Sequence, residues 1–508
     1  MPNPEDTQTP NNASPPQWDA IVIGAGISGL TAAYTLHQAG RKVLVVEAGQ
    51  TPGGLIQSIR EGSTEEGCFQ MEAGPNTFPS TAKELLELAH QLELSPQPAS
   101  PKANKRYLYL HGQLTALPGK PPEALTTPVL SLAGKLRVLL EPFQPRTQTE
   151  DISVADFVSQ RLGKEVLNHL VDPFISGIYA GDVTKLSLPA VFPKLWEWEQ
   201  AGGSLLQGAR QAQKKAHQAR RESGQPTRPP MTLLSFAQGL GALPQALAMA
   251  IPAEQILYGR TVSAISATPL DYPPQTKPPT TDDLADKEST GKEPIAPSAN
   301  TPGYTITTQT GETFCASHVI LATPAHVASP LLAALCPVAS QALGEIPYNS
   351  LTVTHVGLPQ TALPHPLDGF GCLIPQREKR PLLGVIWASS LFPERAPSGQ
   401  VLLSCFAGGA HHPEIFNQPP EAIQQLVLEE LQHLFNAPQA LQPTFCKILK
   451  YEKAIPQYTF GHKARIATAE NALASQHPRI HLCGNHLHGI ALNECVKSGQ
   501  AAAYRVTS

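Results

Sequence analysis

The sequence predicts an α/β fold with a parallel sheet near its N-terminal end, and three observations support this. Residues 20–23 form an apolar run typical of a buried strand, which leads through a glycine-rich turn into an alanine-rich helix at residues 30–38. A second apolar run at residues 43–46 then stops on Glu47. The order strand, turn, helix, strand is that of a βαβ unit, in which a helix joins two parallel strands.

The turn carries the G-x-G-x-x-G pattern of dinucleotide sites. Gly24 permits a tight turn, Gly26 lets a pyrophosphate approach the backbone, and Gly29 lets helix and strand pack closely. The helix N-terminus directs free N–H groups at phosphates, and an acidic residue about 20 positions further on can accept hydrogen bonds from a ribose. A glycine-rich turn in an ordinary α/β protein is the alternative. The predicted dinucleotide contacts are Gly24, Ala25, Gly26, Ile27, Ser28, Gly29 and Glu47.

Two further glycine clusters favour FAD over NAD as this dinucleotide. Residues 51–55 read T-P-G-G-L and residues 71–77 read M-E-A-G-P-N-T. They resemble the R-x-G-G and D/E-x-G segments of flavoproteins with two dinucleotide-binding domains, where glycine lets the backbone approach a bulky ligand. A strand at residues 480–482 ends in another glycine turn at Gly484, and a helix begins near residue 489, so a second helix N-terminus can face an anion. Plain turn glycines are the alternative.

Composition limits the classes of function. The chain has 508 residues, enough for two or three domains, and its formal net charge of −4 gives no basic field for nucleic acid. The eight cysteines contain no C-x-x-C pair and no metal-ligand spacing, which predicts reduced thiols of an intracellular protein and no metal site. Residues 1–17 lack an apolar run, so we expect no secretory signal, and no run of about 20 apolar residues would span a membrane.

The chain begins and ends with pieces of one nucleotide site, which predicts that its other domain is inserted between them.

Residues 205–221 contain several Arg and Lys among Ala and Gln and predict an exposed basic helix, either simply solvated or in contact with anionic lipid or a partner. The predicted segments, in order, are a disordered tail (1–17), the first FAD-binding part (18–100), a helical segment (101–186), a substrate-domain segment with the basic helix (187–230), the second FAD-binding part (231–335) with a disordered insertion (271–302), the substrate-binding domain (336–455) and the third FAD-binding part (456–508).

Four further segments carry a family resemblance. They are N-K-R-Y at 104–107, D-P-F-I-S-G-I-Y-A-G-D at 172–182, P-L-D-G-F-G-C-L-I-P at 366–375 and the stretch from Gly484-Asn485 to Cys495. With the nucleotide segments, they make the chain similar to the protoporphyrinogen oxidase family, flavoproteins of the monoamine-oxidase-like superfamily. The similarity extends along the chain apart from the tail and the 271–302 insertion.

The resemblance implies an FAD-binding Rossmann-like fold with an inserted α+β substrate domain and a mainly helical, membrane-facing segment at 101–186. It implies oxidation of protoporphyrinogen IX to protoporphyrin IX by non-covalent FAD with oxygen as acceptor, in heme or chlorophyll biosynthesis. The flavin does the chemistry, so no side chain is predicted to be catalytic. The implied substrate pocket is Arg106, which would face a propionate, with Gly177, Leu373, Ile386 and Phe406. The implied cofactor contacts are Ala48, Gly54, Leu55, Gly74, Pro75, Asn76, Thr77, Val262, Gly484, Ile490, Ala491 and Leu492.

At position 386 plant-type relatives carry leucine, and we expect the isoleucine here to alter inhibitor fit more than chemistry. The implied partners are the porphyrinogen, oxygen, a membrane surface, a ferrochelatase-like or other chelatase, and a second copy in a homodimer. The implied location is the cytoplasm, with peripheral contact to the membrane. Two alternatives stay open at this point: a coproporphyrinogen III oxidase, whose four substrate propionates would require more cationic groups, and a non-enzymatic escort protein for prenylated partners, which would need no flavin.

Overall fold

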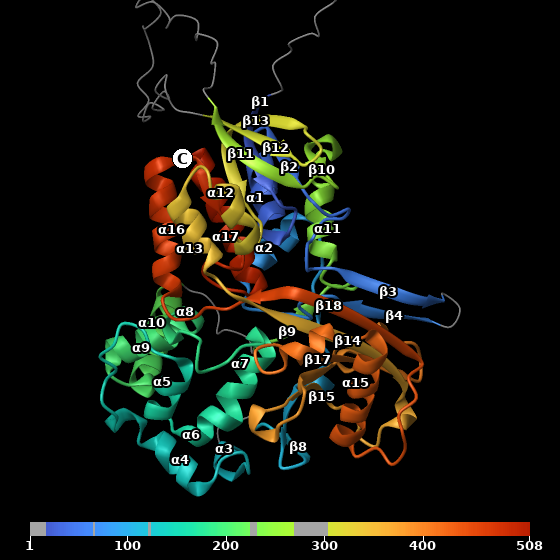
Figure 1. The fold of residues 1–508 in the computed structure, drawn as a ribbon. Coiled ribbons are helices and arrows are strands. Elements are labelled where there is room, and N and C mark those ends of the chain that lie inside the picture. The colour runs from blue at the N-terminus through green and yellow to red at the C-terminus, as the bar shows by residue number, and fades with distance from the viewer. Residues whose placement is uncertain (1–16, 64–66, 120–122, 224–230, 269–302) are drawn as a thin grey trace, which may run out of the picture.

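A computed structural model describes residues 17–63, 67–119, 123–223, 231–268 and 303–508 (Figure 1). The predicted 271–302 insertion and, apart from Gln17, the predicted tail lie outside these residues. The predicted α/β class is confirmed, because two mixed sheets and the helices around them account for most of the described chain. The predicted domain boundaries stay a prediction.

The first sheet contains the βαβ unit and lies at the end of the molecule that holds the C-terminus (Figure 1). Its order is β10-β2-β1-β13-β12-β11, with β19 also paired to β13; β10, β2, β1, β13 and β19 are joined in parallel, whereas β11, β12 and β13 pair antiparallel. The strands are β1 (Gln17–Ile23), β2 (Val43–Val46), β10 (Ile256–Leu257), β11 (Val262–Thr268), β12 (Gly303–Thr308), β13 (Thr313–Leu321) and β19 (Ile480–Leu482).

Helices cover both faces of this sheet because its strands are apolar on both sides. Ala20 and Val22 of β1 join a core with α1 (Ile27–Gln38), α2 (Lys83–Gln91), α11 (Ala242–Met249) and α17 (Leu492–Thr507). Ile21 and Ile23 point to the opposite core, formed with α12 (Ala325–Leu332), α13 (Pro337–Gly344) and α16 (His462–Gln476). α13 belongs to the predicted substrate-binding segment, but it packs on the first sheet.

The second sheet has the order β18-β14-β17-β16-β15-β7-β8, and one of its faces packs against α15 (Pro420–Phe435). β7 and β8 come from the segment predicted to be mainly helical, and β7 pairs in parallel with β15. The strands are β7 (Lys105–Leu110), β8 (Gln113–Ala116), β14 (Tyr348–Pro359), β15 (Gly369–Leu373), β16 (Leu382–Trp387), β17 (Gln400–Gly408) and β18 (Phe445–Pro456).

A helical region with its own core lies at the end of the molecule away from the first sheet (Figure 1). Among the described residues, none of the helices is long and apolar enough to cross a membrane. The helices of this region are α3 (Glu123–Thr126), α4 (Leu132–Leu139), α5 (Val154–Arg161), α6 (Lys164–Val166), α7 (Asp172–Tyr179), α8 (Leu188–Val191), α9 (Pro193–Gly202) and α10 (Leu205–Ser223). The remaining α-helix is α14 (Ala388–Leu391), and the remaining strands form the β3–β4 hairpin (Ser58–Ser63 and Gly67–Glu72) and the small sheet β5-β9-β6 (Phe78–Pro79, Leu233–Ser235 and Gln97–Pro98).

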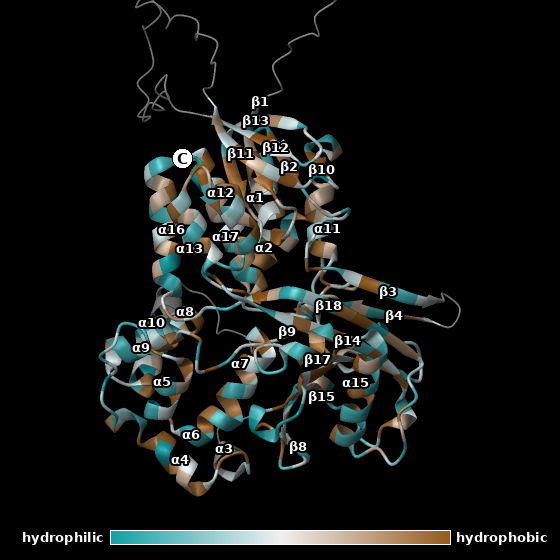
Figure 2. Cartoon of the chain, in the orientation of Figure 1, coloured by the Kyte–Doolittle hydropathy of each residue, from teal (hydrophilic) through white to brown (hydrophobic). Residues whose placement is uncertain are grey.

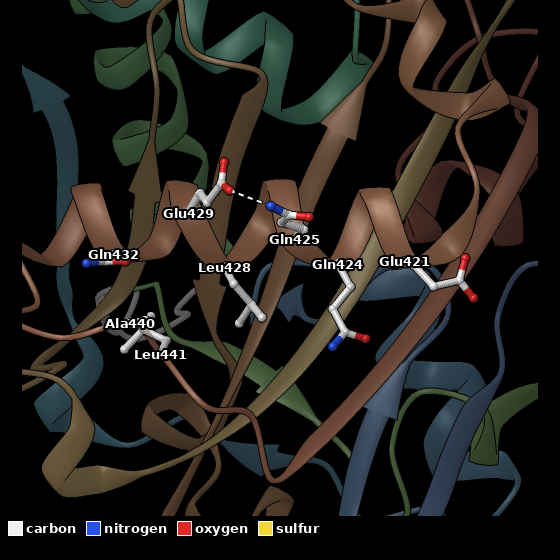
Figure 3. Close-up of a pocket in the computed structure, with 8 residues that line it drawn as sticks. All are labelled: Glu421, Gln424, Gln425, Leu428, Glu429, Gln432, Ala440 and Leu441. Atoms are coloured by element: carbon white, nitrogen blue, oxygen red, sulfur yellow. Dashed lines mark hydrogen bonds between the residues drawn. The ribbon is translucent and has the colours of Figure 1, made fainter.

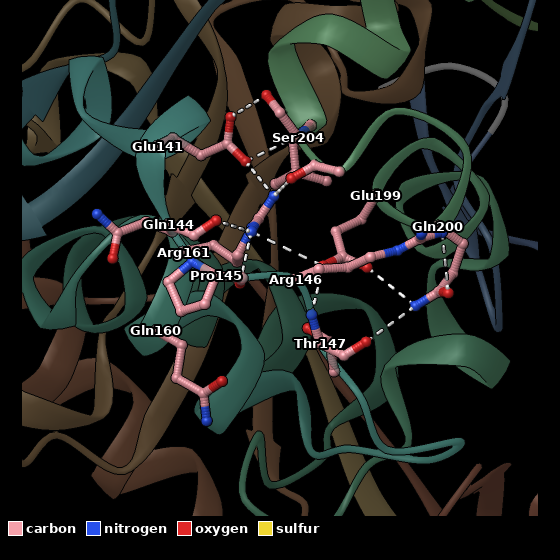
Figure 4. A network of polar contacts seen from close by, with 12 residues as sticks. Glu141, Gln144, Pro145, Arg146, Thr147, Gln160, Arg161, Glu199, Gln200 and Ser204 are labelled. Carbon is pink, nitrogen blue, oxygen red and sulfur yellow. Dashed lines mark hydrogen bonds and ion pairs between the residues drawn. The ribbon is translucent and has the colours of Figure 1, made fainter.

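A buried ion-pair network fixes the basic helix α10 to the rest of the helical region (Figure 4). The Arg161 guanidinium lies 2.9 Å from the Glu141 carboxylate and 3.7 Å from that of Glu199, and all three side chains are buried. Glu141 also accepts hydrogen bonds from the Ser204 hydroxyl and from the Leu205 backbone N–H, at 2.7 and 2.9 Å. Burial alone would raise the pKa of Glu141, but these hydrogen bonds outweigh it and lower the pKa. Glu141 therefore stays charged and caps α10.

Candidate functional site

The predicted dinucleotide turn has the geometry that the glycine pattern requires. Gly24 has a φ of +105°, in the region that favours glycine, and a Cβ on Gly29 would lie 2.0 Å from the Gly24 carbonyl oxygen. By contrast, a Cβ on Gly26 would meet no atom within 4 Å. Gly26 is the N-cap of α1, no side chain caps that helix, and its first turn contains no acidic residue. Open space therefore adjoins backbone N–H groups that lack side-chain partners, as an anion site requires.

Glu47 lies beside this turn, at the end of β2. Its carboxylate accepts hydrogen bonds from the backbone N–H groups of Ala25, at 2.5 Å, and Gly49, at 2.7 Å. The Glu47 carbonyl accepts the N–H of Arg260 at 2.8 Å, which places the start of β11 with Val262 close to Glu47 and Ala48. Each carboxylate oxygen retains a further lone pair for a ribose hydroxyl.

The second and third glycine clusters lie against the first. The Gly53 N–H donates to the Ala25 carbonyl at 2.8 Å, and a Cβ on Gly54 would be 3.7 Å from the Gly26 Cα. A Cβ on Gly74 would be 2.5 Å from the Leu55 carbonyl oxygen, so these two segments are packed together by their backbones. The structure thus brings Gly54, Leu55, Gly74, Pro75, Asn76 and Thr77 toward the dinucleotide turn.

The Asn76 side chain has a buried oxygen, Oδ1, with no hydrogen-bond donor beside it among the described residues. Its side chain is 7 % exposed and donates to the Gly74 carbonyl at 3.3 Å, whereas its Oδ1 has no hydrogen-bond partner among the described residues. A buried acceptor without a donor is costly, and a bound polar group would remove that cost. Leu55, in the neighbouring segment, is 44 % exposed although it is apolar. Both features fit a bulky ligand with an apolar ring system and polar edges.

The C-terminal turn completes this arrangement. Gly484 has a φ of +139°, and its N–H donates to the Ser498 hydroxyl of α17 at 3.0 Å. Ala491 is the N-cap of α17 and is exposed, Ile490 and Leu492 flank it, and no side chain caps the helix. Close approach at Gly499, where a Cβ would lie 2.2 Å from the Ser28 carbonyl oxygen, packs α17 on α1. Two helices with uncapped N-termini therefore lie side by side, and these residues fit a flavin dinucleotide.

Four of the five predicted substrate residues lie on one face of the second sheet, and the fifth, Gly177, lies on α7. Tyr107, Cys372, Val385 and Cys405 belong to the core under α15, so the alternating positions point to the other face. Those positions hold Arg106 on β7, Leu373 on β15, Ile386 on β16 and Phe406 on β17.

Arg106 is exposed, and its guanidinium carbon lies 5.6 Å from the centre of the Phe370 ring. Among the described residues no carboxylate forms an ion pair with it. Its neighbour Lys105 instead pairs with Asp368 at 2.5 Å. The arginine is thus available for an anionic group of a ligand.

α7 covers part of this face. A Cβ on Gly177 would lie 2.3 Å from Leu373 Cδ2, so the absent side chain lets α7 approach β15 closely. The end of α7 is anchored where the Ala180 carbonyl accepts hydrogen bonds from the Asn349 side chain and the Ala410 N–H, at 2.7 and 2.9 Å. Sequence reasoning missed two further residues beside Gly177, Phe174 and Ile178, which are 42 and 41 % exposed. Phe174 lies three positions before Gly177 and four before Ile178, and this spacing was the available signal.

The substrate face and the cofactor segments meet near Phe406. Phe406 shares an apolar cluster with Tyr451 of β18, whose hydroxyl donates to the Ala73 carbonyl at 2.8 Å. Arg106 lies three strands away from Phe406, and strands are about 4.8 Å apart, so the two side chains are separated by about 14 Å across the sheet. This length suits a large flat ligand with a carboxylate at one edge.

A buried ion pair supports the segment that holds Asn76. The Arg395 guanidinium lies 2.9 Å from the Glu72 carboxylate, which also accepts the Ser58 hydroxyl at 2.7 Å. Burial raises the pKa of Glu72, whereas the charge of Arg395 acts in the opposite direction. The sequence did not predict this pairing, since 323 positions separate the two residues.

A shallow pocket elsewhere is unrelated to these sites (Figure 3). It is formed by α15 and the segment that follows it, on the side of the second sheet opposite the predicted substrate face. Its lining residues are Glu421, Gln424, Gln425, Leu428, Glu429, Gln432, Ala440 and Leu441.

Comparison with known proteins gives the class. The chain belongs to the flavin-containing amine oxidoreductase family, whose sequence model matches residues 27–280 and 293–507. The fold agrees, since cyclohexylamine oxidase from Brevibacterium oxydans superposes with a TM-score of 0.67 over 97 % of this chain and 99 % of that one, at 20 % identity. The protein is therefore an FAD-type oxidoreductase.

Within this family the chain groups with the protoporphyrinogen oxidases. It is 30 % identical to chloroplastic protoporphyrinogen oxidase of Nicotiana tabacum over 505 residues, which cover 96 % of this chain and 85 % of the relative. It is 25 % identical to coproporphyrinogen III oxidase of Bacillus subtilis, over 95 % of this chain and 96 % of the relative. The predicted resemblance is confirmed.

Proposed function

We propose that this protein oxidises protoporphyrinogen IX to protoporphyrin IX with FAD as its cofactor and oxygen as electron acceptor. The observation that carries the proposal is the common face of the second sheet, where one cationic side chain, Arg106, is followed by Leu373, Ile386 and Phe406 in the direction of the flavin segments. A macrocycle with apolar rings and a propionate edge matches that order.

The chain's own residues bind and orient in this mechanism. Arg106 would hold a propionate through two parallel hydrogen bonds, and Leu373, Ile386 and Phe406 would exclude water from the rings. Glu47 would accept ribose hydroxyls, and the N-termini of α1 and α17 would face the pyrophosphate and the flavin ring. FAD, when bound, would supply a two-electron acceptor for each of the three two-electron oxidations that the macrocycle undergoes, with oxygen as the final acceptor of the electrons. Because Leu373, Ile386 and Phe406 do not titrate, positioning is the main contribution of the protein.

Coproporphyrinogen III is the alternative substrate, which the similarity to the Bacillus subtilis enzyme favours. It carries four propionates, whereas Arg106 is the single cation among the predicted pocket residues, and this difference favours the two propionates of protoporphyrinogen.

The deciding experiment mixes the purified protein anaerobically with each porphyrinogen and follows the visible absorption of the flavin. We expect faster reduction by protoporphyrinogen. Faster reduction by coproporphyrinogen would reverse the assignment, and a colourless protein that binds no flavin would favour the escort class.

We propose that the FAD is held without a covalent bond. Cys483 and Cys495 lie in the C-terminal cofactor segment, and burial raises the pKa of each thiol to about 12, which keeps them unreactive. Acid precipitation should leave all the flavin in the supernatant, and yellow pellets would contradict this.

We also propose that the helical region makes shallow contact with a membrane. On α4 and just beyond it, Leu132, Leu136, Leu139 and Phe143 are 84, 57, 64 and 81 % exposed, at the end of the molecule away from the first sheet (Figure 2). Leucines three and four positions apart lie along one side of the helix, which is typical of an interfacial helix. Leu136→Asp should weaken binding to phospholipid vesicles. A chelatase partner, a homodimer and a cytoplasmic location stay predictions of the resemblance.

A further inference from the structure

The turn that precedes α17 is held by side chains from a distant part of the chain, residues 457–462, which run from the end of β18 to the first residue of α16. The Tyr458 hydroxyl donates a hydrogen bond to the Asn485 carbonyl. The Tyr458 ring, 1 % exposed, stacks on the His462 imidazole with centroids 4.0 Å apart and planes inclined by 15°. His462 Nε2 in turn lies 3.2 Å from the Leu487 carbonyl oxygen, to which it donates.

Gly489, at the other end of the turn, lies near the same tyrosine. Burial raises the pKa of Tyr458, and the Gly489 backbone acts in the opposite direction. The hydroxyl thus holds the turn through its hydrogen bond to the Asn485 carbonyl, with Gly489 close by at the other end of the turn. Because residues 483–491 form no helix or strand, these contacts supply order that secondary structure does not.

The segment also contacts the substrate side. Gln457 Nε2 donates to the Tyr179 carbonyl at the end of α7, at 2.8 Å, and its Oε1 leaves no room for a Cβ on Gly181, which would lie 2.7 Å away. The Ser187 N–H donates to the Tyr458 carbonyl at 2.8 Å. The same short segment therefore touches the helix whose Gly177 meets Leu373 and the turn that leads into α17.

His462 is held in the neutral state that this arrangement needs. Its side chain is 1 % exposed, and burial lowers its pKa to about 4. Its Nδ1 has no partner among the described residues, so the proton belongs on Nε2, toward Leu487.

We propose that Tyr458 and His462 are positioning residues that hold the 484–489 turn, and with it the N-terminus of α17, in the geometry that binds the flavin. This inference rests on the proposed cofactor site. The two side chains act only through the backbone of the turn, and Gln457 joins their segment to α7.

The test compares Tyr458→Phe with Tyr179→Phe in the full-length protein stripped of flavin. Tyr179 is a suitable control because its ring lies 6.0 Å from that of Tyr458 and its hydroxyl makes none of the hydrogen bonds found among the described residues. FAD is titrated back, its dissociation constant is read from flavin fluorescence, and the unfolding midpoint of the flavin-free protein is measured in parallel.

We expect Tyr458→Phe to raise the FAD dissociation constant about fivefold, the equivalent of one lost hydrogen bond, and Tyr179→Phe to leave it unchanged. His462→Phe keeps a ring against Tyr458 but cannot donate to Leu487, so it should weaken FAD binding in the same direction and replaces Tyr458→Phe if that variant does not fold. The flavin-free unfolding midpoints of Tyr458→Phe and Tyr179→Phe should be similar.

Equal FAD affinities in all three variants would overturn the inference, as would an affinity loss that only follows a lower unfolding midpoint. If the unsubstituted protein itself binds no FAD, the proposed cofactor site is wrong and the inference falls with it. If the unsubstituted protein binds FAD and the variants match it, the proposed function stands and this inference alone is rejected.

Discussion

Replacing Arg106 by alanine tests the proposed substrate face most directly. The guanidinium is exposed, lies over Phe370 and has no ion-pair partner among the described residues, so its removal breaks no contact that folding needs. A charge-assisted hydrogen bond is worth about 1.5–3 kcal/mol, which corresponds to a rise in KM of about 10- to 150-fold if ground and transition states are held equally. Arg106→Lys should restore only part of the substrate affinity that Arg106→Ala loses, since an ammonium cannot make the planar two-point contact.

The assay is the steady-state oxidation of protoporphyrinogen, with the flavin content of each variant measured from its absorption. Lys105→Met is the matched control: it is the adjacent residue on the same strand, it pairs with Asp368, and an exposed ion pair contributes only about 0–1 kcal/mol. We expect its KM to match that of the unsubstituted protein. An Arg106→Ala variant with normal KM and depleted flavin would refute the reasoning, because Arg106 would then serve the fold or the cofactor.

Three further predictions follow from packing and burial. Gly177→Val should displace Leu373, whose Cδ2 is 2.3 Å from the site of a Cβ, and lower kcat/KM while the flavin is retained; unchanged kinetics would show that α7 does not border the substrate. Glu141→Gln should lower the free energy of unfolding by about 1.5–3 kcal/mol because it removes the nearer of the two carboxylates paired with the buried Arg161 and leaves Glu199 at 3.7 Å, and a urea titration measures this. His318 and His481 stack 5.5 Å apart, and burial lowers their pKa values to about 4 and 3. Since the unfolded chain binds these protons first, urea titrations should show the free energy of unfolding falling as pH drops from about 6.5 to 4, with a shallower slope in His318→Asn.

The cofactor half of the site could be predicted well from the sequence because its signals are local. A positive φ at Gly24 and the close approach of Gly29 to the Gly24 carbonyl require glycine within the turn itself. The βαβ order around Glu47 is likewise set by short-range periodicity, and the structure places these segments together as expected.

The substrate half came from motif resemblance, and its geometry could not have been derived locally. Side chains along β7 point alternately to the two faces of the sheet, so the sequence of the strand predicts that Arg106 lies on the opposite face from Lys105 and Tyr107. Nothing in that strand indicates that β15 lies beside it. Phe174 and Ile178 were missed because an apolar residue on a helix is ordinarily assigned to the core, and only the position of α7 leaves them exposed.

The sequence by itself determined the α/β class, the glycine turns and the acidic end of β2, because backbone sterics and periodicity act over a few residues. Only the tertiary structure decided that Glu72 meets Arg395, that Lys105 meets Asp368, and that Tyr458 supports the turn at Asn485. These contacts join segments up to 323 positions apart. Their formation depends on which sheet faces bury together, a property of the whole chain that no local pattern contains.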